Sequence, residues 1–162
     1  MKEIQLTQGK VALVDDEDYE WLNVFKWHAS RGNNTFYARR HIVVNGKWKK
    51  QNMQADVMGE QNLGIMIDHI DGNGLNNQSS NLRSCTAQEN QMNRRKSDRN
   101  FSSMYKGVSW FKRTKRWMAY IKINQKRYYL GYFDIEEDAA KAYDVSAIER
   151  FGEFAKLNFP QN

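Results

Sequence analysis

The sequence has 162 residues, 40% of them hydrophobic and 27% charged, which fits one globular domain or two small ones. Its single cysteine excludes an internal disulfide and a cysteine zinc site, and no apolar run is long enough to cross a membrane. The formal charge of +6 is uneven: residues 93–127 hold twelve Lys or Arg against one acidic residue, which favours an anionic partner. The first residues do not form a signal-peptide pattern, so a cytoplasmic protein is expected.

The first sixty residues read as a small α+β region. Strands are expected at 4–7 and 11–14, followed by a helix that begins in the acidic cluster 15–18. Its buried side should consist of large apolar residues, namely Trp21, Leu22, Phe25 and Trp27. Farther on, Asn45-Gly46 between strand-like runs at 36–44 and 47–53 is a strong hairpin signal. The hairpin is a candidate secondary phosphate contact through its basic residues Arg39, Arg40, Lys47, Lys49 and Lys50.

The stretch from Met66 to Asn90 predicts a strand, a loop, a second strand and a helix. An apolar run ends in Asp68-His69, and a loop rich in Gly and Asn follows. The second strand is expected at 82–85, where Cys85 should be a small buried hydrophobe. Thr86 and Glu89 have the spacing of a capping box, so a helix should start there. This order brings together polar residues from three elements: Asp68, His69, Asn81 and Asn90.

These residue types suit the hydrolysis of a phosphodiester bond. That reaction needs a deprotonated water, a cation beside the phosphate and a stabilised leaving oxygen. Histidine titrates near neutral pH and can take the proton from water. One carboxylate and one amide oxygen suit a hard ion such as Mg²⁺ that keeps several waters. A simple turn between two strands would also explain an isolated Asp-His pair, but four residues at this spacing favour a nuclease.

The layout of residues 64–96 resembles the HNH nuclease family, in the variant of intron-encoded homing endonucleases where Asn replaces the last His. The resemblance implies a ββα-metal motif in which Asp68 and Asn90 hold a divalent metal, Mg²⁺ or Mn²⁺. It implies that His69 is the general base and that Asn81 braces the loop and orients the His69 ring. Many relatives of this type have a His-Arg pair just after the hairpin, where this sequence has Gln54-Ala55. His28 and His41 are interpreted as structural or surface residues.

A basic segment follows the predicted helix. Residues 99–104 are expected to be a polar linker, and the preceding Arg94, Arg95 and Lys96 are candidate phosphate contacts. A basic run of this kind also fits a solvated surface, so both interpretations remain open at this stage.

The last third of the chain predicts three strands and a helix. Strands are expected at 106–110, 116–123 and 127–132. The second strand alternates apolar residues with basic and aromatic ones, so one face should be covered and the other exposed. Asp134 and Glu137 have capping-box spacing, and a helix should run from there to about Phe151, with Gly152 at its end. The small residues of this helix, including Ala139, Ala140 and Ala147, would let it sit close on the sheet.

Motifs across residues 105–160 resemble the APETALA/ethylene-response-factor DNA-binding domain, among them Tyr105-Lys106-Gly107-Val108 and Lys156-Leu157-Asn158-Phe159-Pro160. The resemblance implies a sheet placed in the major groove of DNA. The residues expected toward DNA, together with the basic residues of the adjoining turn, are Lys106, Ser109, Lys112, Arg113, Arg116, Tyr120, Lys122, Arg127 and Tyr129. The plant domains have Arg at position 109 and Glu at position 120, so the plant target sequence does not carry over. The alternative for these residues is a solvated sheet face.

The sequence therefore predicts an α+β protein: a ββα-metal nuclease domain, followed by a three-stranded antiparallel sheet packed on one helix. The nuclease domain should span 1–98 and the DNA-binding domain 105–162. The expected function is that of a metal-dependent homing endonuclease of a phage, prophage or mobile intron, acting on double-stranded DNA as a monomer in the cytoplasm. The alternative is a non-catalytic regulator that binds DNA and carries a degenerate nuclease half.

Overall fold

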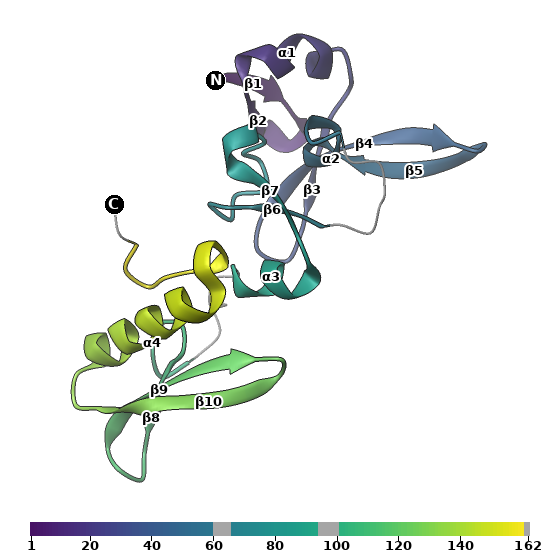
Figure 1. The fold of residues 1–162 in the computed structure, drawn as a ribbon. Helices are drawn as coiled ribbons and strands as arrows, with labels where there is room; N and C mark the ends of the chain where they lie inside the picture. Colours follow the sequence, from purple (N-terminus) through teal and green to yellow (C-terminus); the bar gives the residue numbers. More distant parts are fainter. Residues whose placement is uncertain (60–65, 94–100, 161–162) are drawn as a thin grey trace. The chain divides into compact units, whose positions relative to one another are not determined.

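The computed structural model describes residues 1–59, 66–93 and 101–160 and divides into two compact units, Met1–Thr86 and Ala87–Asn162 (Figure 1). Antiparallel sheets and helices occur in both, which confirms the predicted α+β class. None of the helices in the described residues has the length and apolar character needed to span a bilayer.

The first unit contains three small antiparallel sheets. The paired strands β1 and β2 come first, then the short helix α1, and a three-stranded sheet β3-β4-β5 follows. Helix α2 leads to the paired strands β6 and β7. The bounds are β1 Lys2–Gln5, β2 Val11–Val14, α1 Asp16–Asn23, β3 His28–Arg31, β4 Phe36–Val44, β5 Lys47–Asn52, α2 Met53–Val57, β6 Met66–His69 and β7 Leu82–Cys85. A 3-10 turn, Ser79–Asn81, precedes β7.

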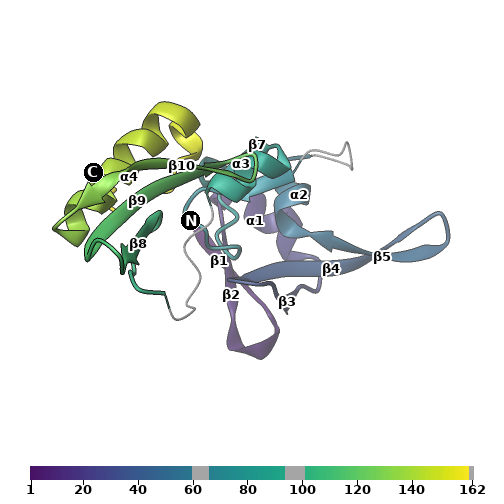
Figure 2. The same cartoon turned by 90° about the horizontal axis from the view of Figure 1, so that it is seen from below.

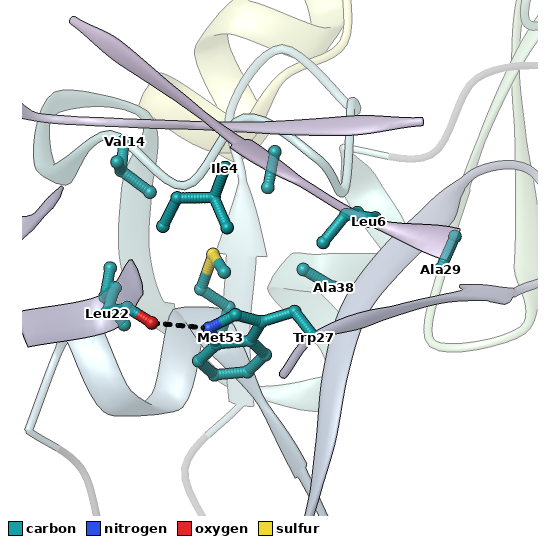
Figure 3. Packing of buried hydrophobic residues seen from close by; sticks show 9 residues of the cluster. Ile4, Leu6, Val14, Leu22, Trp27, Ala29, Ala38 and Met53 are labelled. Carbon is teal, nitrogen blue, oxygen red and sulfur yellow. Dashed lines mark hydrogen bonds between the residues drawn. The ribbon is translucent and has the colours of Figure 1, made fainter. Parts of the chain in front are cut away.

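The core of this unit is formed by side chains from β1, β2, α1, β4 and α2 (Figure 3). Ile4, Val14, Leu22 and Met53 are almost completely buried there, and each such side chain stabilises the fold by about 1.5–3 kcal/mol. The indole of Trp27 fills the base of the cluster, and its Nε1 donates a hydrogen bond of 2.9 Å to the carbonyl oxygen of Leu22. This cluster packs the β1–β2 sheet against the β3-β4-β5 sheet.

The predicted buried side of α1 is correct only in part. Leu22 and Trp27 are buried, but Trp21 and Phe25 are 40% and 37% exposed. The reason is that α1 ends at Asn23, so Phe25 and Trp27 do not continue its helical face. A helix of eight residues has room for one buried turn, and here Leu22 supplies it.

The β4–β5 hairpin extends away from the rest of the first unit (Figures 1 and 2). Asn45 and Gly46 both have positive φ, 52° and 72°, the combination required by a type I′ turn. The predicted hairpin is thereby confirmed, with its strands at 36–44 and 47–52.

The second unit has α3, three strands in the order β8-β9-β10 and the long helix α4. Their bounds are α3 Ala87–Met92, β8 Val108–Phe111, β9 Arg116–Ile123, β10 Lys126–Phe133 and α4 Glu136–Phe151. Helix α4 packs on one face of the sheet through completely buried Ala139, Ala140 and Ala147. Alternate β9 residues, including Ala119 and Ile121, face this helix, as the period of two predicted.

Two details of this unit differ from the prediction. The strand expected from Lys106 begins at Val108, because Gly107 has φ +75° and interrupts the extended conformation. The capping box at Asp134 is wrong: the N-cap of α4 is Ile135, without a side-chain cap bond. Asp134 instead accepts hydrogen bonds of 2.7 and 3.0 Å from Arg116 on β9.

Candidate functional site

The β6–β7 ladder places the predicted catalytic pair at the end of a strand. The antiparallel register sets His69 opposite Leu82 and Asp68 opposite Arg83. Both Asp68 and His69 are buried, with 7% and 5% of their surfaces exposed. The ladder therefore ends in two buried polar side chains.

Asp68 forms an ion pair across the ladder. Arg83 Nη2 lies 2.8 Å from Asp68 Oδ2, and Arg83 Nε donates to the same oxygen over 3.2 Å. Both side chains are almost buried, with 11% and 8% exposed. A carboxylate in such surroundings needs a cationic partner, because desolvation otherwise disfavours its charged form. Arg83 thus supplies a cationic partner to the carboxylate that precedes His69 in the chain.

Asn81 braces the loop between the strands. Its Oδ1 accepts a hydrogen bond of 3.0 Å from the Asp71 backbone, and its Nδ2 donates to Asp71 Oδ1 and to the Asn76 carbonyl over 3.1 and 2.8 Å. Its own carbonyl accepts from Ile70 N over 2.9 Å. These four bonds close the loop across its base.

The same loop is tied to the N-terminal hairpin. Backbone hydrogen bonds of 2.8 Å run from Leu13 N to Leu75 O and from Asn77 N to Leu13 O. Asp15, at the start of α1, accepts from Ser79 N over 2.8 Å and from the Gln78 amide over 3.1 Å. The Ser79 backbone bond is the main reason that the pKa of Asp15 lies below its usual 3.8. One residue of the acidic cluster therefore holds the loop.

The side chain that the structure places on the His69 ring is Asn77, which is completely buried. Asn77 Oδ1 lies 3.4 Å from His69 Nε2, while Asn77 Nδ2 donates to Leu75 O over 3.2 Å and so fixes the amide orientation. An amide oxygen can only accept, so Nε2 carries the ring proton in this contact and the lone pair of the neutral ring lies on Nδ1. The Asn81 side chain, which was expected to orient this ring, bonds to Asp71 and Asn76.

The surroundings of His69 keep its ring neutral. Burial lowers the pKa of His69 below its usual 6.5, and it outweighs the Asn77 hydrogen bond and the charges of Asp71 and Asp68, which act in the opposite direction. The ring of Tyr37 on β4 packs beside it, with centroids 5.8 Å apart and planes inclined by 57°. At neutral pH the imidazole can therefore accept a proton.

The donor set can be compared with the metals it would suit. Asp68 offers a carboxylate and Asn90 an amide oxygen, both hard ligands. Asp68 belongs to the first unit, whereas Asn90 lies half-buried on α3 in the second. Within residues 1–59, 66–93 and 101–160 there is no group of three or more His, Cys, Asp or Glu that could hold a metal. The residues fit a hard divalent cation that keeps most of its waters, and they do not fit zinc bound by three or four protein ligands.

Most residues expected to contact DNA lie on the outer face of the second unit's sheet. The face opposite α4 carries five of them in register, Ser109 on β8, Tyr120 and Lys122 on β9, and Arg127 and Tyr129 on β10. The guanidinium of Arg127 lies over the Tyr120 ring at 4.9 Å. Arg116 shares this face but is paired with Asp134. Lys112 and Arg113 are exposed in the β8–β9 turn.

Lys106 is the exception within this group. Its Nζ donates to the carbonyl oxygen of Met92 at the end of α3, and burial lowers its pKa to about 8. This lysine therefore caps a helix within the second unit instead of extending toward a ligand. The remaining basic candidates, Arg94, Arg95 and Lys96, lie outside the described residues.

Gln54, at the position where many relatives carry histidine, is buried in the first turn of α2. Only 6% of its surface is exposed, and among the described residues its Oε1 has no hydrogen-bond partner. Its neighbour Met53 belongs to the core. The structure thus gives Gln54 a place in the packing of α2.

Comparison with known proteins supports both halves of this arrangement. The family model described as HNH endonuclease matches residues 40–92, and the one described as AP2 domain matches residues 103–153. An uncharacterized HNH endonuclease of Acanthamoeba polyphaga mimivirus is 39% identical over 151 residues, which are 93% of this chain and 76% of that protein. The chain belongs to the HNH endonuclease family. Its C-terminal part is an AP2 domain.

Two other proteins are similar to parts of this HNH endonuclease family member. Protein 3.8 of Escherichia phage T7 is 35% identical over 119 residues, 74% of this chain and 89% of that protein. APETALA2-like protein 2 of Oryza sativa subsp. indica is 45% identical over 65 residues, 40% of this chain. The chain spans only 15% of the length of that plant protein. The similarity to the plant protein therefore supports the AP2 domain alone.

Three residues around the predicted catalytic pair of this HNH endonuclease chain were not expected from the sequence. Arg83 could have been found from the ladder, because a register with His69 opposite Leu82 puts Arg83 opposite Asp68. Asn77 stands in a run of similar residues and had no distinguishing signal. Tyr37 lies on a strand more than thirty positions away in the sequence, so only the tertiary structure brings it to the ring.

Proposed function

We propose that this protein is a divalent-metal-dependent DNA endonuclease that hydrolyses phosphodiester bonds in duplex DNA, and that it is a site-preferring homing endonuclease. The observation that carries the proposal is the state of His69. Its ring is buried and neutral, and its proton is directed to Asn77, so that Nδ1 holds the lone pair. A histidine prepared in this way at the end of the β6 strand is suited to deprotonate water.

In the reaction that we propose, Nδ1 of His69 takes a proton from a water molecule as the water oxygen attacks the phosphorus. A P–O bond to the neighbouring sugar then breaks. Tyr37 and Asn77 fix the plane of the ring from two sides. The Asp68 carboxylate, neutralised in part by Arg83, stabilises the imidazolium that forms.

We assign Asp68 and Asn90 as the residues that hold the metal. When bound, a divalent cation supplies charge neutralisation at the phosphate and stabilisation of the leaving oxygen. The oxygen-only donor set supports Mg²⁺ or Mn²⁺ over zinc. A cation held by Asp68 would share this carboxylate with Arg83, which donates to Oδ2. Chelation by EDTA should therefore stop cleavage, and added Mg²⁺ or Mn²⁺ should restore it.

The AP2 domain is the part that we propose to supply affinity and site preference. Its exposed sheet face combines cations with aromatic side chains, as at Arg127 over Tyr120. Cations of this kind bind phosphates, and side chains in the major groove read base edges. A cytoplasmic location and binding to DNA as a monomer remain predictions.

The deciding experiment is a nicking assay on plasmid DNA with the variant His69→Ala. We expect a loss of about 10²–10⁴ in rate, because a general base contributes on that order, with DNA binding retained. Ser80→Ala, an exposed substitution in the same loop, serves as the control and should cut like the wild type. Wild-type-like cleavage by His69→Ala would remove the mechanism.

The alternative of a non-catalytic regulator is separated by the same assay. A regulator with a degenerate nuclease half would bind DNA and leave the plasmid intact with every metal tested. If cutting is seen, sequencing the ends of cleaved genomic DNA identifies the preferred site.

A further inference from the structure

One face of the β3-β4-β5 sheet forms a continuous row of aromatic and cationic side chains that starts at His69. Directly opposed residues of an antiparallel ladder lie on the same face, and side chains along a strand alternate. The register pairs His28 with Arg39, His41 with Lys50 and Val43 with Trp48. We call this surface the track face, and it comprises His28, Tyr37, Arg39, His41, Trp48 and Lys50.

The inner end of the track face is anchored at the catalytic ring. Tyr37 packs on His69, with centroids 5.8 Å apart, and the guanidinium of Arg39 lies 5.7 Å from the Tyr37 ring centroid. Arg39 is also held by neutral partners: it donates to Asn52 Oδ1 over 2.7 Å and to Ser30 Oγ over 3.0 Å. Its cation is thus positioned without being neutralised.

The outer end of the track face is a stack of rings with an exposed tip. His28 and His41 stack with centroids 5.1 Å apart and planes inclined by 14°. Trp48 meets His41 edge-on at 6.5 Å. Trp48 is 74% exposed near the end of the hairpin, so its indole is open to further contact beyond the edge of His41.

The two faces of the hairpin differ in how their charges are compensated. On the opposite face, Arg40 is paired with Asp56 at 2.9 Å, and its guanidinium lies 3.8 Å from the Phe25 ring centroid. On the track face, none of His28, Arg39, His41 and Lys50 forms an ion pair with a carboxylate of the described residues. Burial and the positive charges of His41, Arg39 and Lys50 lower the pKa of His28, so the fixed cations Arg39 and Lys50 repel further positive charge on this face. A polyanion would relieve this repulsion.

We propose that the track face is a second DNA-binding surface, along which the duplex on one side of the scissile phosphate lies. The inference rests on the proposed nuclease function for its starting point at His69. From Tyr37 to Val43 a strand rises about 20 Å, which corresponds to roughly six base pairs of duplex. A two-stranded ribbon has the width to enter a major groove. Arg39, His41 and Lys50 then contact phosphates, and Trp48 contacts sugars or bases.

The hairpin offers a matched pair of variants for the test. Lys50 and Lys49 are adjacent and exposed, but they lie on opposite faces. The full-length variants Lys50→Gln and Lys49→Gln lose the same charge, and binding of each to a duplex of mixed sequence is measured in EDTA at several salt concentrations. We expect Lys50→Gln to reduce the slope of log K against log salt by about 0.9, one phosphate contact, and Lys49→Gln, on the opposite face, to reduce it less. Equal slopes for the two variants would overturn the proposal.

Trp48→Ala gives an independent readout. An aromatic contact with sugars or bases releases no counterions, so this variant should bind about tenfold more weakly, as stacking contacts do, with the salt slope of the wild type. An unchanged affinity would contradict the role of the tip. Because binding is measured without metal, a protein that binds in this way but never cuts would support the track face and refute the nuclease proposal. A protein that cuts DNA, but whose variants do not differ in binding, would support the nuclease proposal and refute the track face.

Discussion

At the scale of single residues, the pair His69–Asn77 decides which nitrogen can act as a base. The Asn77 amide is fixed by Leu75 O on one side, so its oxygen must face Nε2. If that contact is lost, the ring can take either tautomer and can rotate within the space that Tyr37 leaves. In the proposed mechanism, Asn77 is a positioning residue whose effect on the chemistry passes through His69.

Substitution of Asn77 should separate positioning from binding. We expect Asn77→Ala to lower the cleavage rate about 10–100-fold, the range seen for partners that orient functional histidines, with DNA affinity unchanged. Asn77→Asp keeps an acceptor but adds a charge that favours imidazolium, so it should raise the pKa of His69. Since the base must be neutral, the acid limb of its pH–rate profile should move to higher pH. Identical pH profiles for the wild type and Asn77→Asp would show that the contact plays no part in the reaction.

At the scale of elements, the loop between β6 and β7 depends on a helix that is far away in the sequence. Asp15 precedes the first residue of α1 and receives Ser79 N and the Gln78 side chain. A carboxylate that accepts a backbone N–H is stabilised in its charged form, which is why its pKa falls. The acidic cluster 15–18 was expected to begin this helix, and the use of Asp15 to hold the loop could not be read from the sequence.

The charge of Asp15 should make part of the stability depend on pH. Its folded pKa lies below the unfolded value of about 3.8, so its contribution is fully present above pH 3.8 and is lost as pH falls through the folded pKa. We expect Asp15→Asn to be less stable than the wild type to urea at pH 7, with the difference shrinking below pH 3.8. Glu17→Gln, which removes an exposed carboxylate from the same turn, is the control. A difference that is equal at pH 3 and pH 7 would assign the effect to packing instead of charge.

The elements that the sequence predicted well are those with a strong local signal. Asn45-Gly46 located the β4–β5 hairpin, and the alternation of β9 located the face under α4. Strand β3 and helix α2 were missed, because four and five residues are too few to show a period. In the candidate site, too, only residues with a local sequence signal were predicted. Spacing singled out Asp68, His69 and Asn81, whereas Arg83, Asn77 and Tyr37 required the register and the tertiary contacts.

At the scale of the whole molecule, the charge divides along the boundary of the two units. Residues Met1–Thr86 contain ten Lys or Arg and ten Asp or Glu, so that unit is formally neutral. Residues Ala87–Asn162 contain fifteen and nine, so they carry the whole net charge of +6. Long-range attraction to DNA therefore comes from the second unit, and in the first unit only local surfaces such as the track face can attract phosphates.

Helix α3 links the two functions along the chain. Its sequence completes the nuclease motif, and it carries Asn90, yet its contacts within the second unit include the AP2 sheet and α4. Met92 packs in the cluster with Ile121, Tyr143 and Phe151. Gln88 donates to Asn124 Oδ1 in the β9–β10 turn over 2.7 Å, and Lys106 donates to Met92 O. The predicted domain boundary after residue 98 places α3 in the nuclease domain. The contacts of Met92 and Gln88, in contrast, pack α3 against the AP2 domain.

Fragments cut on either side of α3 test this assignment. We expect residues 87–162 to be more stable to urea than residues 101–162 by about 1–2 kcal/mol, because the shorter fragment exposes part of the cluster around Met92 and loses the Gln88 bond. Both fragments should bind duplex DNA, with affinity that falls steeply with salt, and neither should cut it.

The fragment of residues 1–100 keeps all four motif residues, but it lacks the AP2 sheet and the helix α4 that pack against α3. It should therefore bind DNA far more weakly and cut it slowly at best. The variant Met92→Ala in fragment 87–162 should remove most of the added stability, while Gln91→Ala, exposed on the same helix, should not. If the two C-terminal fragments unfold at the same urea concentration, α3 belongs to the nuclease half alone and the AP2 domain does not position Asn90.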